Sequence, residues 1–111
     1  MENSHKNLII VIDDDPVMRL SCSKILANEI VEAYEDGEKG LGRIEEAQSD
    51  LIVIDLKMPK IGGIDVIQKV HQFDPSICII VITGYATVET AVDAIRAGAY
   101  DFLPKPFTLD E

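Results

Sequence analysis

Five short apolar runs, rich in isoleucine and valine, restrict how this chain can fold more than any other feature of its sequence. Most of the runs are nearly continuous rather than alternating, which is typical of strands that are covered on both faces and therefore of a parallel sheet. The second run is more mixed and is expected to form an edge strand. The five expected strands are Leu8–Ile12, Ile30–Tyr34, Leu51–Asp55, Ile77–Thr83 and Tyr100–Leu103.

Helical patterns lie between these runs, and the first of them has the clearest start. Asp15 and Pro16 suit the N-cap and the first position of a helix. The apolar residues that follow are spaced by four and then three positions, which predicts one buried helix face. That face is expected to consist of Met18, Cys22 and Ile25.

The later helical patterns are less uniform. The second, Glu38–Ala47, is weak, because Gly40 and Gly42 each cost about 1 kcal/mol relative to alanine. A third helix is expected to end before Asp74, and a fourth before Gly98, which suits the position just after a helix. The apolar residues that mark these two helices are Ile64, Ile67 and Val70 in the third and Val88, Ala91, Val92 and Ile95 in the fourth.

Strands that alternate with helices predict an open α/β sheet with right-handed crossovers. The length of 111 residues suits one domain, and no linker or repeat divides it. Because the sequence ends where a fifth helix would begin, we expect that helix to be missing or truncated and one face of the sheet to be half covered. We therefore expect residues 1–111 to be the N-terminal part of a longer protein.

Acidic side chains dominate the charged residues. Asp and Glu outnumber Lys and Arg by 20 to 10, which gives a formal net charge of −10. Such a surface repels nucleic acid and anionic lipid, so neither is an expected partner. No apolar run approaches the roughly 18 to 20 residues that span a bilayer, and the polar N-terminus lacks a signal-peptide pattern. We expect a cytoplasmic protein in which Cys22 and Cys78 are reduced thiols in or near the core.

Polar residues follow four of the five expected strands, at the ends where an open parallel sheet binds its ligands. Asp55 ends the third strand, Thr83 ends the fourth, and Lys105 follows the fifth. The first strand is followed by three consecutive acids, Asp13, Asp14 and Asp15. We therefore expect acids, a hydroxyl and an ammonium group to meet at one rim.

Such a gathering of acids needs compensation. Two carboxylates about 4 Å apart repel by about 4 kcal/mol at an effective dielectric constant of about 20. A divalent cation is the simplest compensation, and Lys105 adds to it. Carboxylate ligands suit Mg²⁺, which keeps several waters and often shares a phosphate, or Mn²⁺. Asp13 and Asp14 are the better-placed ligands.

The rim favours phosphoryl chemistry without a separate base. No Ser–His or Cys–His arrangement accompanies it. A carboxylate, with a reference pKa of about 3.9, is already ionised at neutral pH and can attack phosphorus to form an aspartyl phosphate. Asp55 is the best nucleophile, because it stands alone at a strand end and faces the acidic pair. Lys105 and the cation would offset charge on the phosphoryl oxygens.

Four segments, in this order and spacing, resemble the receiver domain of two-component response regulators. They are IIVIDDDPVMR, LIVIDLKMPKIGG, VITGYAT and AGAYDFLPKPF, and the resemblance extends from Leu8 to Phe107. It implies a flavodoxin-like fold with strand order 2-1-3-4-5 and helices on both faces. The segment GYATVETAVDAIRAGAYDFLPKPF most resembles regulators of the nitrogen-regulatory, enhancer-binding type.

The resemblance also implies a role for each residue of the rim. Asp55 is the phosphoacceptor, Lys105 pairs with the phosphoryl oxygens, and Thr83 donates a hydrogen bond to them. Thr83 and Phe102 form the switch, and the Lys105–Pro106 peptide bond is cis. The implied metal ligands are Asp13, Asp14, Asp55 and the backbone carbonyl of Lys57.

The partners implied by the resemblance are those of a signalling domain rather than an enzyme. A sensor histidine kinase or phosphotransfer protein donates the phosphoryl group from a phosphohistidine. The added charge of about −1.5 to −2 would change the surface of the fourth helix and fifth strand and so control an output domain or partner, including in transcription regulation. The same surface could form a homodimer.

Three other functions use a similar architecture. An interaction module that is not phosphorylated would not need the complete set of Asp55, Thr83 and Lys105. A phosphatase of the haloacid-dehalogenase type needs an acid two residues after its nucleophile, where this chain has Lys57. A flavin carrier would bring a phosphate against the acidic first loop, which repels it.

Overall fold

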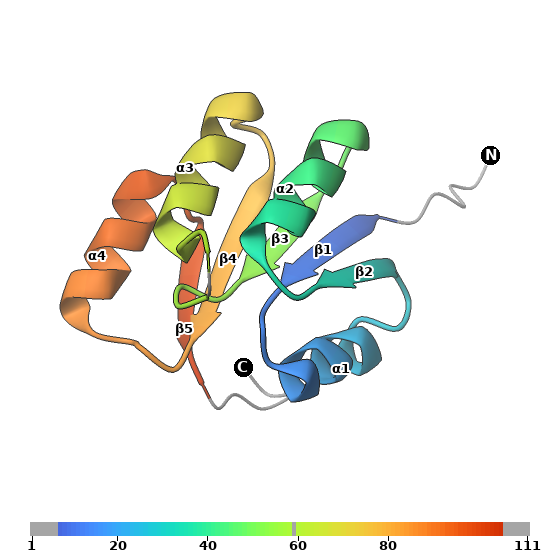
Figure 1. The fold of residues 1–111 in the computed structure, drawn as a ribbon, viewed down its shortest axis with the longest axis horizontal. Coiled ribbons are helices and arrows are strands. Elements are labelled where there is room, and N and C mark those ends of the chain that lie inside the picture. The colour runs from blue at the N-terminus through green and yellow to red at the C-terminus, as the bar shows by residue number, and fades with distance from the viewer. Residues whose placement is uncertain (1–6, 59, 106–111) are drawn as a thin grey trace.

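The computed structural model describes residues 7–58 and 60–105. Within these residues strands and helices alternate along the chain (Figure 1), which confirms the expected α/β class. Each predicted strand lies within one residue of its observed position. The strands are β1 (Leu8–Ile12), β2 (Ile30–Tyr34), β3 (Leu51–Ile54), β4 (Cys78–Thr83) and β5 (Asp101–Pro104). The helices are α1 (Pro16–Ile25), α2 (Gly37–Glu46), α3 (Gly63–Phe73) and α4 (Val88–Ala97).

All five strands form one parallel sheet in the order β2-β1-β3-β4-β5, as the resemblance implies. The mixed second run forms the edge strand β2, and the apolar runs β1, β3 and β4 are central. The register sets Ile12 of β1 opposite Ile54 of β3. β1, β2 and β3 therefore end at the same level, and β4 and β5 run two residues further. The residues at these strand ends meet at one edge of the sheet.

Two apolar clusters cover the two faces of the sheet. Ile10 and Ile12 of β1 belong to a larger cluster with side chains from α2, α3 and α4, whereas Ile9 and Val11 pack with side chains of α1. Figure 1 shows α2, α3 and α4 side by side, with α1 apart from them. Helices thus lie on both faces, and α1 alone covers the second face in the part of the chain described.

The apolar residues of α1 and α4 are less buried than their spacing suggests. The prediction that Ile25 joins Met18 and Cys22 in the buried face is wrong, because Ile25 is the last residue of α1 and stays 41% exposed. The predicted helix α4 is confirmed, but its small residues Ala94 and Ala97 face the core. The apolar residues exposed on α4 are Val88, Val92 and Ile95.

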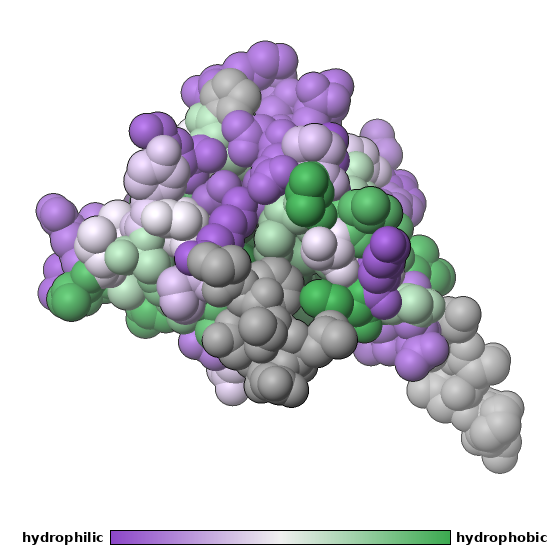
Figure 2. Space-filling model, turned by 90° about the horizontal axis from the view of Figure 1, so that it is seen from below, coloured by the Kyte–Doolittle hydropathy of each residue, from purple (hydrophilic) through white to green (hydrophobic). Residues whose placement is uncertain are grey.

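Further apolar surface lies on α1, where Val17 and Leu20 are exposed. A view from below shows apolar and polar side chains interspersed on this side of the molecule (Figure 2). Cys22 and Cys78 are both free thiols, buried and partly buried, as predicted. The expected truncation of a fifth helix and the cis Lys105–Pro106 bond concern residues 106–111, which lie outside the described residues. None of the helices described combines the length and the hydropathy that crossing a bilayer requires.

Candidate functional site

The loop between β1 and α1 is shaped by its own acids. The Asp15 carboxylate accepts a hydrogen bond from the backbone N–H of Val17 at 3.0 Å and caps α1, as predicted. The Asp15 N–H in turn donates to Oδ1 of Asp13 at 3.0 Å. Asp13 is buried and Asp14 is exposed. The loop therefore holds one carboxylate against the sheet and leaves its neighbour toward solvent.

Asp55 follows β3 at the same edge of the sheet. Its backbone N–H donates to the carbonyl oxygen of Ile12 at 3.1 Å, which continues the pairing of β3 with β1. Its side chain is only 7% exposed, and the backbone N of Lys57 lies 3.4 Å from its Oδ1 atom. The strand pairing thus places the Asp55 carboxylate beside the residue that follows β1, Asp13.

The structure brings the three predicted acids together. One carboxylate oxygen from each of Asp13, Asp14 and Asp55 lies within 4.8 Å of the others. Lys105 Nζ contacts Oδ2 of Asp13 at 2.9 Å and Oδ2 of Asp55 at 3.2 Å. One ammonium group cannot balance three carboxylates. The excess negative charge and the all-oxygen donor set fit a divalent cation such as Mg²⁺.

Burial and neighbouring charges shift the pKa values of Asp13 and Lys105. Burial raises the pKa of Asp13 above its ordinary value of 3.8, and it outweighs the opposite effects of the Asp15 N–H and of Lys105. Burial works against the charge of Lys105, but its contacts with Asp13 and Asp55 prevail and raise its pKa. Without a cation, the fold disfavours the charge on Asp13 despite the adjacent ammonium.

Thr83 and Phe102 lie on the neighbouring strands β4 and β5. Thr83 ends β4 and is fully buried, and its Oγ1 accepts a hydrogen bond from the backbone N–H of Tyr85 at 3.2 Å. The Lys105 N–H donates to the Thr83 carbonyl oxygen at 2.8 Å, which joins the ends of β4 and β5. Phe102 lies opposite Val81 in the sheet and packs, partly buried, against the larger apolar cluster.

Two contacts at this rim were not expected from the sequence. The Lys57 ammonium lies 4.5 Å from the centre of the Tyr85 ring, so the loops after β3 and β4 meet beside Asp55. Arg19 Nη1 donates to the backbone carbonyl oxygen of Asp13 at 2.8 Å. Both contacts depend on the conformations of long side chains, which the sequence pattern does not predict. Only the position of Arg19, one turn into the predicted first helix, indicated a side chain near the acidic loop.

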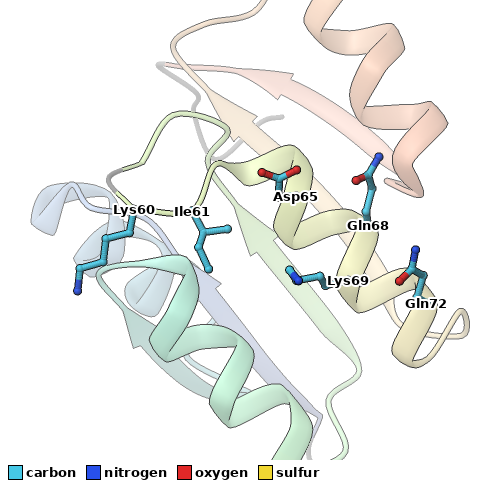
Figure 3. Close-up of a pocket in the computed structure, with 6 residues that line it drawn as sticks. All are labelled: Lys60, Ile61, Asp65, Gln68, Lys69 and Gln72. Atoms are coloured by element: carbon cyan, nitrogen blue, oxygen red, sulfur yellow. The ribbon is translucent and has the colours of Figure 1, made fainter.

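A separate hollow of about 440 Å³ lies along α3 (Figure 3). Lys60 and Ile61 reach it from the loop before the helix, and the other side chains come from α3 itself. The hollow shares no residue with the acidic rim, and its lining carries charges of both signs. Its lining residues are Lys60, Ile61, Asp65, Gln68, Lys69 and Gln72.

Comparisons with known proteins agree with this geometry. Residues 9–111 match the family described as the response regulator receiver domain. The chain is 34% identical over 107 residues to the regulatory protein AtoC of Escherichia coli K12, covering 95% of this chain and 23% of AtoC. It is 33% identical over 105 residues to the chemotaxis protein CheY of Bacillus subtilis 168, covering 92% of this chain and 88% of CheY.

A solved structure resembles the whole arrangement. The solution structure of the beryllofluoride-activated NtrC4 receiver domain dimer superposes with a TM-score of 0.87 at 34% identity, over 93% of this chain and 87% of that one. The chain spans less than a quarter of AtoC. The family match itself begins in β1 and includes the three acids, Thr83 and Lys105. The chain therefore belongs to the response regulator receiver domain family.

Proposed function

We propose that this chain is a phosphorylation switch that accepts a phosphoryl group onto Asp55 from a phosphohistidine. The donor is a sensor histidine kinase or a phosphotransfer protein. The observation that carries the proposal is the position of Lys105 Nζ, 2.9 Å from Asp13 and 3.2 Å from Asp55, at the edge where three acids gather. A receiver domain is a signalling module rather than a turnover enzyme.

Asp55 is the proposed nucleophile. One of its carboxylate oxygens forms a bond to phosphorus while the bond between phosphorus and the donor's imidazole nitrogen breaks, and the imidazole leaves with that electron pair. A carboxylate needs no separate base for this step. Lys105, which already contacts Asp55, is placed to offset charge on the transferred oxygens.

The proposed holders of a divalent cation are the carboxylates of Asp13, Asp14 and Asp55, together with the backbone carbonyl of Lys57. Mg²⁺ is the expected ion and Mn²⁺ its substitute. When bound, the cation would supply positive charge next to the phosphoryl oxygens. The excess of carboxylates over ammonium groups at the rim supports this assignment.

Thr83 and Phe102 are the proposed switch. The Thr83 hydroxyl accepts from the Tyr85 N–H, so its own proton is available for a phosphoryl oxygen. Movement of Thr83 toward that oxygen would leave space in which Phe102 of β5 turns inward. The result is a shift between two packings of α4 and β5, which phosphorylation must favour by a few kcal/mol.

The surface of α4 and β5 is the proposed contact for partners. Exposed apolar side chains gather on α4, and Tyr100, just before β5, is 77% exposed. Apolar side chains of this kind favour protein contacts. The NtrC4 receiver is a dimer in its activated form, and this likeness supports a homodimer of the present chain through α4 and β5.

The whole protein is proposed to be longer than this domain. AtoC is a regulatory protein more than four times the length matched here, which supports residues 1–111 as the receiver of a longer regulator. Its N-terminal position, its cytoplasmic location and its role in transcription stay predictions. The negative charge of the chain supports the view that nucleic acid is contacted by another part of that protein.

The test is phosphorylation by acetyl phosphate, a small-molecule donor, in the presence of Mg²⁺. Wild-type protein should become phosphorylated, and Asp55→Asn should show no phosphorylation. Asp65→Asn, which removes an exposed acid on α3, is the matched control and should behave as wild type. Equal phosphorylation of wild type and Asp55→Asn would refute the assignment, and no phosphorylation of wild type would favour an interaction module.

A further inference from the structure

Arg19 makes an uncommon contact for an arginine beside a cluster of acids. It lies in the first turns of α1, and its Nη1 atom donates to the backbone carbonyl oxygen of Asp13 at 2.8 Å. The residues described show no ion pair between Arg19 and any carboxylate. A guanidinium group usually pairs with a carboxylate through two hydrogen bonds. Here it bonds a backbone carbonyl group instead.

This contact is not explained by local helix stability. A positive charge near the start of a helix is disfavoured by the helix dipole, and fixing a long side chain costs rotamer freedom. Arg19 is also only partly buried, so it contributes little to the core. What the contact does is fix one peptide group in the acidic loop.

That peptide group joins two of the acids. A peptide unit is planar, so fixing the carbonyl oxygen of Asp13 also fixes the direction in which the chain enters Asp14. The Asp13 side chain is held separately by the Asp15 N–H at 3.0 Å. Arg19 and Asp15 therefore restrain the main chain and the side chain of the same loop, from which two of the three converging carboxylates come.

We infer that Arg19 is a positioning residue, which holds the Asp13–Asp14 peptide so that the acids converge before a cation arrives. This inference rests on the proposed divalent-cation site. Groups that orient metal ligands typically change metal affinity by about 10- to 100-fold when they are removed. Loss of the Arg19 contact should therefore raise the dissociation constant for Mg²⁺ by at least about tenfold.

The sign of this effect separates positioning from simple electrostatics. Removing the positive charge of Arg19 also removes its Coulomb repulsion of a nearby cation. On electrostatic grounds alone, cation binding should therefore become stronger. Arg19→Met keeps most of the apolar stem of the side chain but removes both the charge and the donor. Positioning predicts weaker binding in this variant, whereas charge alone predicts tighter binding.

The experiment is calorimetric titration of the metal-free protein with Mg²⁺. Arg96→Met is the matched control, because Arg96 is an exposed residue in the last turn of α4 and loses the same charge. Arg19→Met should bind at least about tenfold more weakly than wild type, Arg19→Lys should recover part of the loss, and Arg96→Met should bind as wild type or more tightly.

The outcomes are distinguishable from failure of the proposed function. If wild type shows no Mg²⁺ binding, the cation site itself is wrong and the inference falls with it. If wild type binds and Arg19→Met binds equally or more tightly, the cation site stands and the role of Arg19 is refuted. Circular dichroism of each variant is recorded first, and should Arg19→Met not fold, Arg19→Leu, which also lacks the charge and the donor, replaces it under the same rule.

Discussion

Single residues at the rim show how function opposes stability in this fold. Asp13 is buried next to two other carboxylates. Burial raises its pKa, so in the folded protein its ionised form is disfavoured relative to the unfolded chain. Because the folded state then binds the proton more tightly, the contribution of Asp13 to stability falls as pH rises above 3.8, its ordinary pKa.

Asp13→Asn should therefore stabilise the metal-free protein at neutral pH. The variant removes a charge that the fold disfavours, while Lys105 keeps Asp55 as its partner. Thermal unfolding should show a higher midpoint for the variant at neutral pH and a smaller difference in acid. Mg²⁺ should raise the midpoint of wild type more than that of the variant. A lower midpoint for Asp13→Asn at neutral pH, with no change for Asp93→Asn, which removes an exposed acid inside α4, would contradict this account.

At the scale of single elements, Gly40 and Gly42 of α2 are both expected to weaken the helix from the sequence, but they differ in their surroundings in the structure. A Cβ atom on Gly40 would lie 2.4 Å from Cδ1 and 2.6 Å from Cγ1 of Ile12, which is fully buried in β1. A Cβ atom on Gly42 would meet nothing within 4 Å. Gly40 thus allows α2 to approach the sheet just before the acidic loop, whereas Gly42 only weakens the helix.

Gly42→Ala and Gly40→Ala should consequently change stability in opposite directions. Gly42→Ala should raise the free energy of unfolding by about 0.5–1 kcal/mol, because alanine is the better helix former. Gly40→Ala should lower it by about 1–3 kcal/mol through overpacking against Ile12. Urea denaturation measures both. Effects of the same sign in the two variants would contradict the close contact between Gly40 of α2 and Ile12 of β1.

The start of α4 depends on a threonine pair that is tied to the loop after β4. The Thr90 hydroxyl donates to the carbonyl oxygen of Tyr85 at 2.7 Å and accepts from the N–H of Thr87 at 2.9 Å, within a capping box. Tyr85 donates its own N–H to Thr83. These bonds connect the proposed switch hydroxyl to the first turn of α4.

Thr90→Val should loosen this connection without disturbing the core. The variant keeps the shape of the side chain but loses the hydroxyl, which should cost about 1 kcal/mol. Amide hydrogen exchange should then become faster at Thr87, whose N–H loses its acceptor. Thr90→Ser keeps the hydroxyl and serves as the control. Equal exchange rates in the valine and serine variants would mean that the bond does not hold the helix start.

At the scale of the whole molecule, two apolar surfaces differ in their proposed use. One lies on α4 and the other on α1. Ile95→Glu on α4 should weaken dimerisation of the beryllofluoride-activated protein by more than about tenfold, or about 1.4 kcal/mol. Val17→Glu on α1 should leave it unchanged. Analytical ultracentrifugation measures both, and a dimer that survives Ile95→Glu would place the interface elsewhere.

Much of this architecture could be predicted because it depends on short-range patterns. Continuous apolar runs fixed the parallel sheet, and the residues after those runs predicted the meeting of Asp13, Asp14, Asp55 and Lys105. The buried faces of α1 and α4 were harder. Periodicity identifies a helical stripe, but not whether it faces a core, as Ile25 and the exposed stripe of α4 demonstrate.

Unlike the contacts of Lys105, the contacts of three further long side chains at the rim were not predicted from the sequence. The positions of Arg19, Lys57 and Tyr85 relative to the acids depend on loop paths and rotamers, which no local pattern encodes. The cluster of acids and Lys105 therefore follows from the strand ends, whereas the contacts around it depend on the loops.

The central claim is that Asp55 receives the phosphoryl group when a divalent cation is present. The most direct measurement is to incubate wild-type protein with acetyl phosphate and Mg²⁺, reduce it with borohydride, and map the product by tandem mass spectrometry. The account predicts homoserine in place of Asp55, and no conversion when the cation is removed by a chelator. Conversion at a different acid, or conversion at Asp55 that is unaffected by the chelator, would contradict it.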